Sequence, residues 1–126
     1  ELAQEKAEKK GEVDKDLAGK KAISKIRDVP VVIAVTTKLT PNDSFREEED
    51  FAATVCSLHN LVLSLWDLGI GSQWSTGSIT RDSSTYKHLQ IDEQKERIIG
   101  FLKIGYPERV PDKKISNTDQ FKHYLP

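Results

Sequence analysis

One long helix constrains the fold of this chain more than any other feature of the sequence. From residue 44 to residue 68 the sequence favours a helix, and after Glu49 its apolar side chains occupy most of the helical wheel. These apolar residues are Phe51, Ala52, Ala53, Val55, Cys56, Leu58, Leu61, Val62, Leu63, Leu65, Trp66 and Leu68. A surface helix would show one apolar stripe, so we expect this helix to be buried, with a second subunit as its expected cover.

Both ends of this helix carry recognisable signals. Ser44 followed by Glu47 matches a capping box, and Gly69 suits the left-handed residue that ends many helices. Within the helix we interpret Cys56 as a small buried hydrophobic residue. His59 and Asn60 are interpreted as structural contacts across a subunit interface in preference to catalytic groups.

Two apolar runs predict strands on either side of this helix. Residues 31–35 (VVIAV) are mostly β-branched, which favours a central strand covered on both faces, and residues 97–105 (RIIGFLKIG) predict a second strand. A short extended segment (SQWSTG) and a brief helix capped by Asp82 or Ser83 lie between the long helix and the second strand. Strands separated by helices imply an α/β or α+β layered domain, and we predict one domain over residues 1–126.

Charge and cysteine content exclude several classes of protein. The 19 basic and 20 acidic residues nearly cancel, so no overall field favours nucleic acid or an anionic membrane. A single cysteine cannot form an internal disulfide, which favours a cytoplasmic location, and no apolar run is long enough to span a membrane. The chain starts at Glu1 and contains no Met, so we expect it to be N-terminally incomplete.

The segment GIGSQWSTGS, residues 69–78, raises the question of a phosphate-binding loop. Such loops run from strand through glycines to helix, whereas these glycines follow a helix and precede an extended segment. Trp74, Ser75 and Thr76 offer a flat apolar surface with polar groups at its rim, which suits a planar heteroaromatic ligand. The alternative is a packed tryptophan with its neighbouring hydroxyls facing water.

Other candidate sites are weaker. Lys113 and Lys114 could clamp a phosphate group, or could be ordinary solvated surface charges. The acidic run Glu47 to Asp50 is explained by the dipole at a helix start, and the three histidines are scattered, so we predict no metal site. No arrangement of a nucleophile and its base is apparent, and we predict no catalytic side chain.

Taken together, two segments resemble the FMN-dependent nitroreductase family, and within it the members of minimal length. They are EEDFAATVCSLHNLVLSLWDLGIGSQWSTG and, after a short helix, ERIIGFLKIGYPERVPDKK. The recognisable parts are Asp50, Ala52, Ala53, Asn60-Leu61, the helix end at residues 68–71 and the strand end at residues 104–107. The tail from Phe121 to Leu125 also resembles that of the small members.

The resemblance implies an α+β fold with a mixed sheet flanked by helices and a long buried helix at a homodimer interface. It implies one FMN per subunit, reduced by NADH or NADPH, and transfer of hydride to a nitroaromatic, a quinone or a related acceptor. Because the flavin carries the chemistry, no acid or base residue is needed. On this basis Trp74, Ser75 and Thr76 line the flavin, and Lys113 or Lys114 lies near its phosphate.

The chain departs from the family pattern at its front. Members usually begin with an arginine-rich segment that grips the phosphate, and residues 1–29 instead resemble the helical stretch before the first strand. This departure leaves a second hypothesis open, in which the chain is a truncated, flavin-free homodimeric interaction module without catalytic activity.

Overall fold

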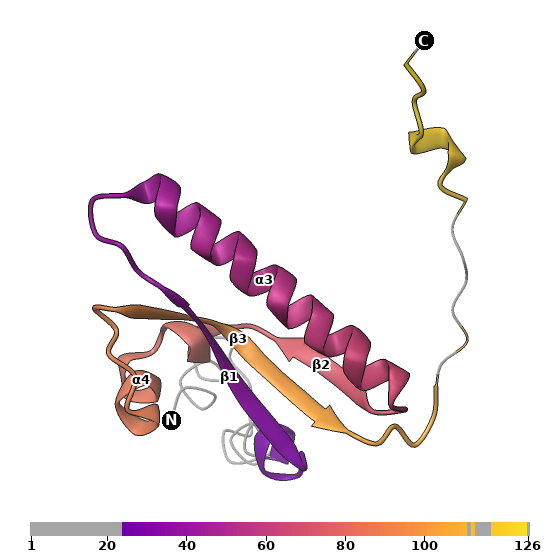
Figure 1. The fold of residues 1–126 in the computed structure, drawn as a ribbon. Coiled ribbons are helices and arrows are strands. Elements are labelled where there is room, and N and C mark those ends of the chain that lie inside the picture. Colours follow the sequence, from indigo (N-terminus) through magenta and orange to yellow (C-terminus); the bar gives the residue numbers. More distant parts are fainter. Residues whose placement is uncertain (1–23, 111, 113–116, 126) are drawn as a thin grey trace, which may run out of the picture.

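A computed structural model describes residues 24–110, 112 and 117–125 of the chain (Figure 1). Helical residues 24–27 precede Pro30, and the remaining elements follow in the order strand, long helix, strand, short helices, strand. They are β1 (Val31–Lys38), α3 (Ser44–Asp67), β2 (Gly71–Ser75), η1 (Ser78–Arg81), α4 (Ser83–Leu89), β3 (Glu96–Gly105) and η2 (Asp119–Phe121). The predicted strands and helices are thus present, with β1 three residues longer than the predicted run of residues 31–35.

The described strands form one antiparallel sheet in the order β1-β3-β2. Val31 pairs with Ile104 at one end of β1, and a bulge after Val35 shifts the register before Lys38 pairs with Glu96. One prediction is therefore wrong for this part of the chain. Its central strand is β3, not the run VVIAV, and both of its strand pairs are antiparallel. A β-branched apolar run favours a strand but does not fix its position in the sheet.

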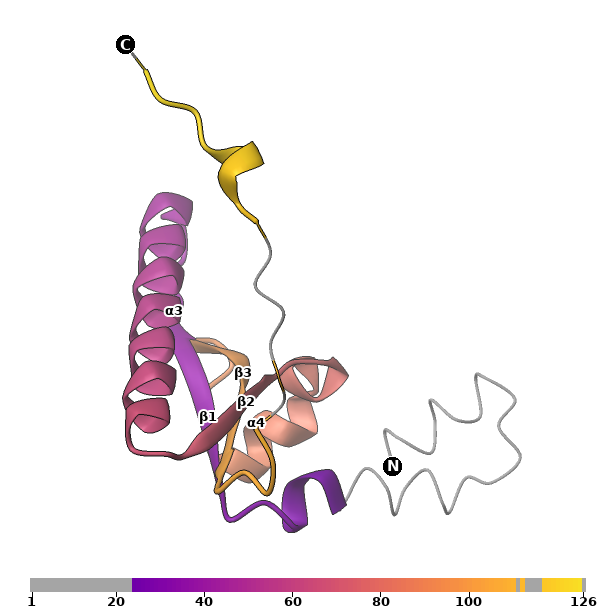
Figure 2. The same ribbon diagram turned by 90° about the vertical axis from the view of Figure 1, so that its right-hand side faces the viewer.

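Helices lie on both faces of this sheet. In Figure 2 the long helix α3 runs along one face, and η1 and α4 lie on the other. The buried apolar side chains come from α3, α4 and β3, and Leu102 of the central strand is fully buried. They are Leu58, Tyr86, Ile98, Ile99 and Leu102. This layered arrangement of helices on an antiparallel sheet agrees with the α+β prediction.

The helix α3 begins one residue differently from the prediction. Its N-cap is Asp43, whose side chain accepts the amide hydrogen of Arg46 at 3.0 Å. The carboxylate of Glu47 reaches back to the amide of Thr40, also at 3.0 Å, and not to Ser44. Aspartate caps a helix as well as serine does, so the preceding residue takes the role predicted for Ser44.

The other end of α3 follows the prediction. Gly69 has a φ of +73°, and its amide donates to the carbonyl oxygen of Trp66. The amide of Ile70 donates to the carbonyl oxygen of Leu65, which completes a Schellman motif. Gly69 of GIGSQWSTGS therefore ends a helix, whereas Gly71 is already the first residue of β2.

The expected burial of α3 is not found in the single chain. Only Leu58 is buried along its length, and Trp66 keeps 54% of its surface exposed. Cys56, His59 and Asn60 are exposed as well, so the single chain by itself buries none of these three residues. The reason is geometric, because one sheet face covers only one side of a helix.

Candidate functional site

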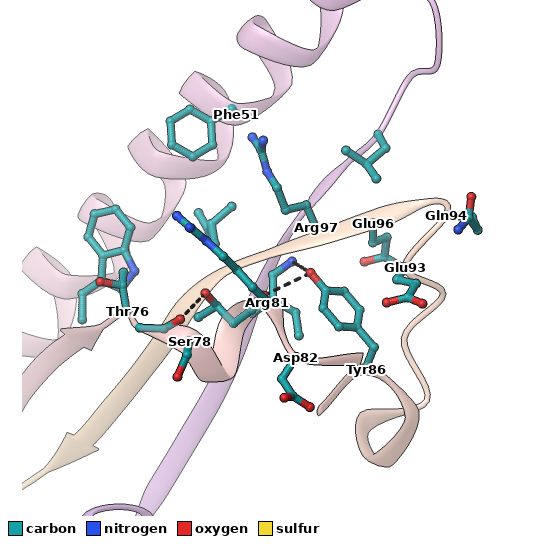
Figure 3. Close-up of a pocket in the computed structure, with 16 residues that line it drawn as sticks. Phe51, Thr76, Ser78, Arg81, Asp82, Tyr86, Glu93, Gln94, Glu96 and Arg97 are labelled. Atoms are coloured by element: carbon teal, nitrogen blue, oxygen red, sulfur yellow. Dashed lines mark hydrogen bonds between the residues drawn. The ribbon is translucent and has the colours of Figure 1, made fainter. Parts of the chain in front are cut away.

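A cleft of about 1430 Å³ opens beside the central strand, where β2 ends and β3 continues (Figure 3). Ser75, the last residue of β2, pairs with Phe101, so the earlier half of β3 has no strand partner on that side among the described residues. We call this hollow the edge cleft. Its lining residues are Leu39, Phe51, Trp74, Thr76, Gly77, Ser78, Thr80, Arg81, Asp82, Tyr86, Glu93, Gln94, Glu96, Arg97, Ile98 and Ile99.

The wall of the edge cleft is built around the buried hydroxyl of Tyr86. This hydroxyl accepts the amide hydrogen of Ile98 at 2.9 Å and donates to the carbonyl oxygen of Thr80 at 3.2 Å. The hydroxyl of Thr80 donates in turn to the carbonyl oxygen of Gly77 at 2.8 Å. The phenol of Tyr86 thereby connects α4 and η1 to the edge of β3. It also accepts the hydrogen bond of the Ile98 amide, which has no partner in a neighbouring strand.

Trp74 lies against the backbone of β3 at Gly100. A Cβ atom at Gly100 would stand only 2.0 Å from the indole Nε1 and 2.6 Å from Cδ1. Glycine at this position therefore lets the indole lie directly on the strand, where 44% of its surface remains exposed. The indole N–H has no acceptor among the described residues, so this group is available to a ligand in the cleft.

The segment after Trp74 adds backbone donors to the rim. The amides of Thr76 and Gly77 donate to no acceptor among the residues that the structure describes. Gly77 has a φ of +149°, a conformation reserved almost entirely for glycine, and a Cβ there would meet no atom within 4 Å. The rim thus includes two backbone N–H groups that have no acceptor among the described residues.

The structure separates the residues that the sequence singled out. Trp74 and Thr76 both line the edge cleft, whereas Ser75 between them does not. Alternation along an extended segment explains this difference, since neighbouring side chains point to opposite faces. Lys113 and Lys114 fall outside the described residues, so their proximity to a phosphate remains a prediction.

Sequence reasoning missed several residues of the cleft. Arg81 ends η1 and Arg97 stands near the start of β3, with its guanidinium carbon 5.3 Å from the centre of the Phe51 ring. Tyr86 comes from the short helix α4. Three separate elements bring these side chains to one place, and the only local signal was a charged residue, Arg97, at the head of an apolar strand.

Residues 24–110, 112 and 117–125 contain neither a metal site nor a membrane-spanning helix. Within these ranges no three His, Cys, Asp or Glu side chains gather in an arrangement that could hold a metal ion. Across the same ranges no helix has the length and apolar character needed to cross a bilayer.

Comparison with known proteins places this fold. The model of the nitroreductase family matches residues 1–106, which is most of the chain. The chain belongs to the nitroreductase family. Its α+β nitroreductase-like fold is also that of a solved structure, the nitroreductase-like family protein from Bacillus cereus, with a TM-score of 0.74 and 25% identity. That match covers 85% of this chain and 57% of the other.

A curated relative gives a similar picture at the level of sequence. The Bacillus subtilis (strain 168) protein named "Putative NAD(P)H nitroreductase YfhC" is 33% identical over 86 residues, or 68% of this chain. The match covers 43% of that relative, so this nitroreductase-family chain spans less than half the length of the curated protein it matches.

Proposed function

We propose that this nitroreductase-family chain acts in an NAD(P)H-dependent flavin oxidoreductase that reduces nitroaromatics, quinones or similar acceptors through bound FMN. The observation that carries the proposal is the edge cleft, which is lined by Trp74 on Gly100 and by Thr76 and Gly77, whose amides have no acceptor among the described residues. The family assignment supports the same function, as does the name of the Bacillus subtilis relative.

The residues present fit a flat heteroaromatic ring with polar edges. Glycine at position 100 leaves room for a planar side chain on the strand, and the rim offers N–H donors to ring nitrogen or oxygen acceptors. We propose that Trp74 and Thr76 hold the ring, with Ser75 contributing through the backbone of the same segment. Lys113 or Lys114 would neutralise the phosphate.

In this proposal the flavin and the protein have separate roles. FMN, when bound, would supply the redox chemistry between NAD(P)H and the acceptor. The chain binds the ring, orients it and keeps one of its faces against protein. Neither metal nor acid–base side chain is required of the chain in this proposal. The cytoplasm is the proposed location, and a homodimer packed through α3 the proposed assembly.

A flavin-free homodimeric interaction module is the second candidate. The large apolar side chains left exposed on α3 favour it, because exposed apolar surface often marks an interface. In this reading the interface is retained and the catalysis is not.

Flavin binding separates the two candidates. The protein is purified as its gene encodes it and examined for flavin absorbance, then mixed with NADH or NADPH without oxygen. Loss of the yellow colour, followed by its return on addition of a quinone, supports the oxidoreductase. A colourless protein that FMN does not reconstitute excludes it. The 126-residue chain is titrated with FMN in parallel, and micromolar binding by this chain alone excludes the flavin-free module.

A further inference from the structure

The edge cleft contains two arginines that are not neutralised by protein carboxylates. Arg81 and Arg97 both line it and both are exposed. No described Asp or Glu approaches either guanidinium within ion-pair distance, in contrast to Arg46, whose partners are Glu49 and Asp50. In Figure 3 both guanidiniums extend toward the side of the cleft where Phe51 of α3 lies.

The acidic residues of the same cleft are occupied elsewhere. Asp82 caps α4 and accepts hydrogen bonds from the amide and the hydroxyl of Ser84. Glu93 accepts from the hydroxyl of Ser83 at 3.0 Å.

Glu96 accepts from the hydroxyl of Thr36 at 2.5 Å and is thereby tied to β1. Figure 3 draws Asp82, Glu93 and Glu96 on the side of the cleft away from Phe51. The cleft therefore has its two guanidiniums at one end and its three carboxylates at the other, with no ion pair between them among the described residues.

Aromatic surface accompanies this positive charge. Phe51 lies under the guanidinium of Arg97, and both Phe51 and Trp74 remain partly exposed in the cleft. A planar guanidinium binds a carboxylate through two parallel hydrogen bonds, and aromatic rings stack on indole and phenyl groups. The complementary ligand carries an aromatic ring and an anionic group on the same small molecule.

We propose that the acceptor reduced at this site is an aromatic carboxylate, with its anionic group bound by Arg81 and Arg97 and its ring packed against Phe51. This inference rests on the proposed function, because it names the class of acceptor for the same cleft. For a nitroaromatic acid the overall step is NAD(P)H + H⁺ + ArNO₂ → NAD(P)⁺ + ArNO + H₂O. The carboxylate is unchanged and serves only for binding.

Two matched probes test the charge. Binding of 4-nitrobenzoate and of its neutral counterpart 4-nitrobenzamide is measured by calorimetry on the purified protein, as isolated with whatever flavin it contains. We expect 4-nitrobenzoate to bind at least roughly tenfold more tightly, the factor typical of one good hydrogen bond to a charged group. Arg81→Gln and Arg97→Gln should each reduce this preference, and the double variant should abolish it.

Two controls keep the result interpretable. Arg109→Gln removes an exposed arginine outside the cleft and should leave the preference intact. Arg97→Lys keeps the charge and should retain part of the preference even if Arg97→Gln weakens packing on Phe51. Equal binding of the two probes by the wild-type protein, or an unchanged preference in the double variant, would overturn the proposal.

Other anions could meet the same arginines, and the experiment distinguishes them. If the double variant weakens FMN binding instead, the arginines serve the flavin phosphate and the proposal is wrong. If the double variant changes only the ratio of NADPH to NADH affinity, the two arginines bind the additional phosphate of NADPH, and the proposal is wrong in this case too. Because the calorimetric test needs no turnover, loss of the acceptor preference is separable from failure of the protein to act as a flavin oxidoreductase.

Discussion

The hydroxyl of Tyr86 accepts the amide hydrogen of Ile98 at 2.9 Å, and this contact fixes α4 to the open half of β3. Tyr86→Phe would leave that buried amide without a partner and also remove the bond to Thr80. We expect a loss of about 1–3 kcal/mol in the free energy of unfolding, measured by urea denaturation. Tyr106→Phe, at an exposed position, serves as the control and should change stability little. Equal effects of the two variants would show that the phenol does not support the strand edge.

Gly100→Ala tests the placement of Trp74. The new methyl group would overlap the indole, so Trp74 must move, at a cost of about 1–3 kcal/mol typical of overpacking. Weaker FMN binding should accompany the shift, together with altered tryptophan fluorescence. The same substitution in a Trp74→Ala background removes the overlap and should cost much less. A similar cost in both backgrounds would contradict the contact between indole and strand.

Local chemistry explains which parts of this fold were predictable from sequence. The end of α3 at Gly69 and the cap of α4 at Asp82 each depend on residues within a few positions, and both were predicted. The position of β1 in the sheet depends on pairing with a strand far along the chain, as in Val31 with Ile104, and it was predicted wrongly. Sequence periodicity contains no information about such pairing.

The candidate site divides in the same way. Trp74 and Thr76 were found because a tryptophan beside hydroxyls is unusual in a short extended segment. Arg81, Tyr86 and Arg97 were missed because each looks ordinary in its own segment, and the cleft exists only where η1, α4 and β3 meet. The family resemblance did not predict these three residues either, because it implied only residues that line the flavin or lie near its phosphate.

The cap of α4 predicts a pH dependence of stability. Hydrogen bonds from the hydroxyl and amide of Ser84 lower the pKa of the Asp82 carboxyl below its ordinary value of about 3.8. A lowered pKa in the folded state stabilises the protein above the unfolded pKa, and this contribution is lost as pH falls through the folded value. Thermal denaturation between about pH 6 and pH 3 should therefore show a smaller decline for Asp82→Asn than for the wild-type chain. Parallel curves for the two proteins would exclude this role of Asp82.

Exposed apolar residues on α3 predict the assembly. Leu61 is 37% exposed in the single chain, and if a second copy covers this helix, Leu61→Glu would place a charge in an apolar interface. We expect the variant to dissociate to monomers at concentrations where the wild-type protein is a dimer, as measured by sedimentation. Leu89→Glu is the matched control, since Leu89 has similar exposure but lies on α4, across the sheet from α3. If Leu61→Glu remains a dimer while Leu89→Glu dissociates, the interface lies on the α4 side and the placement proposed for α3 is wrong.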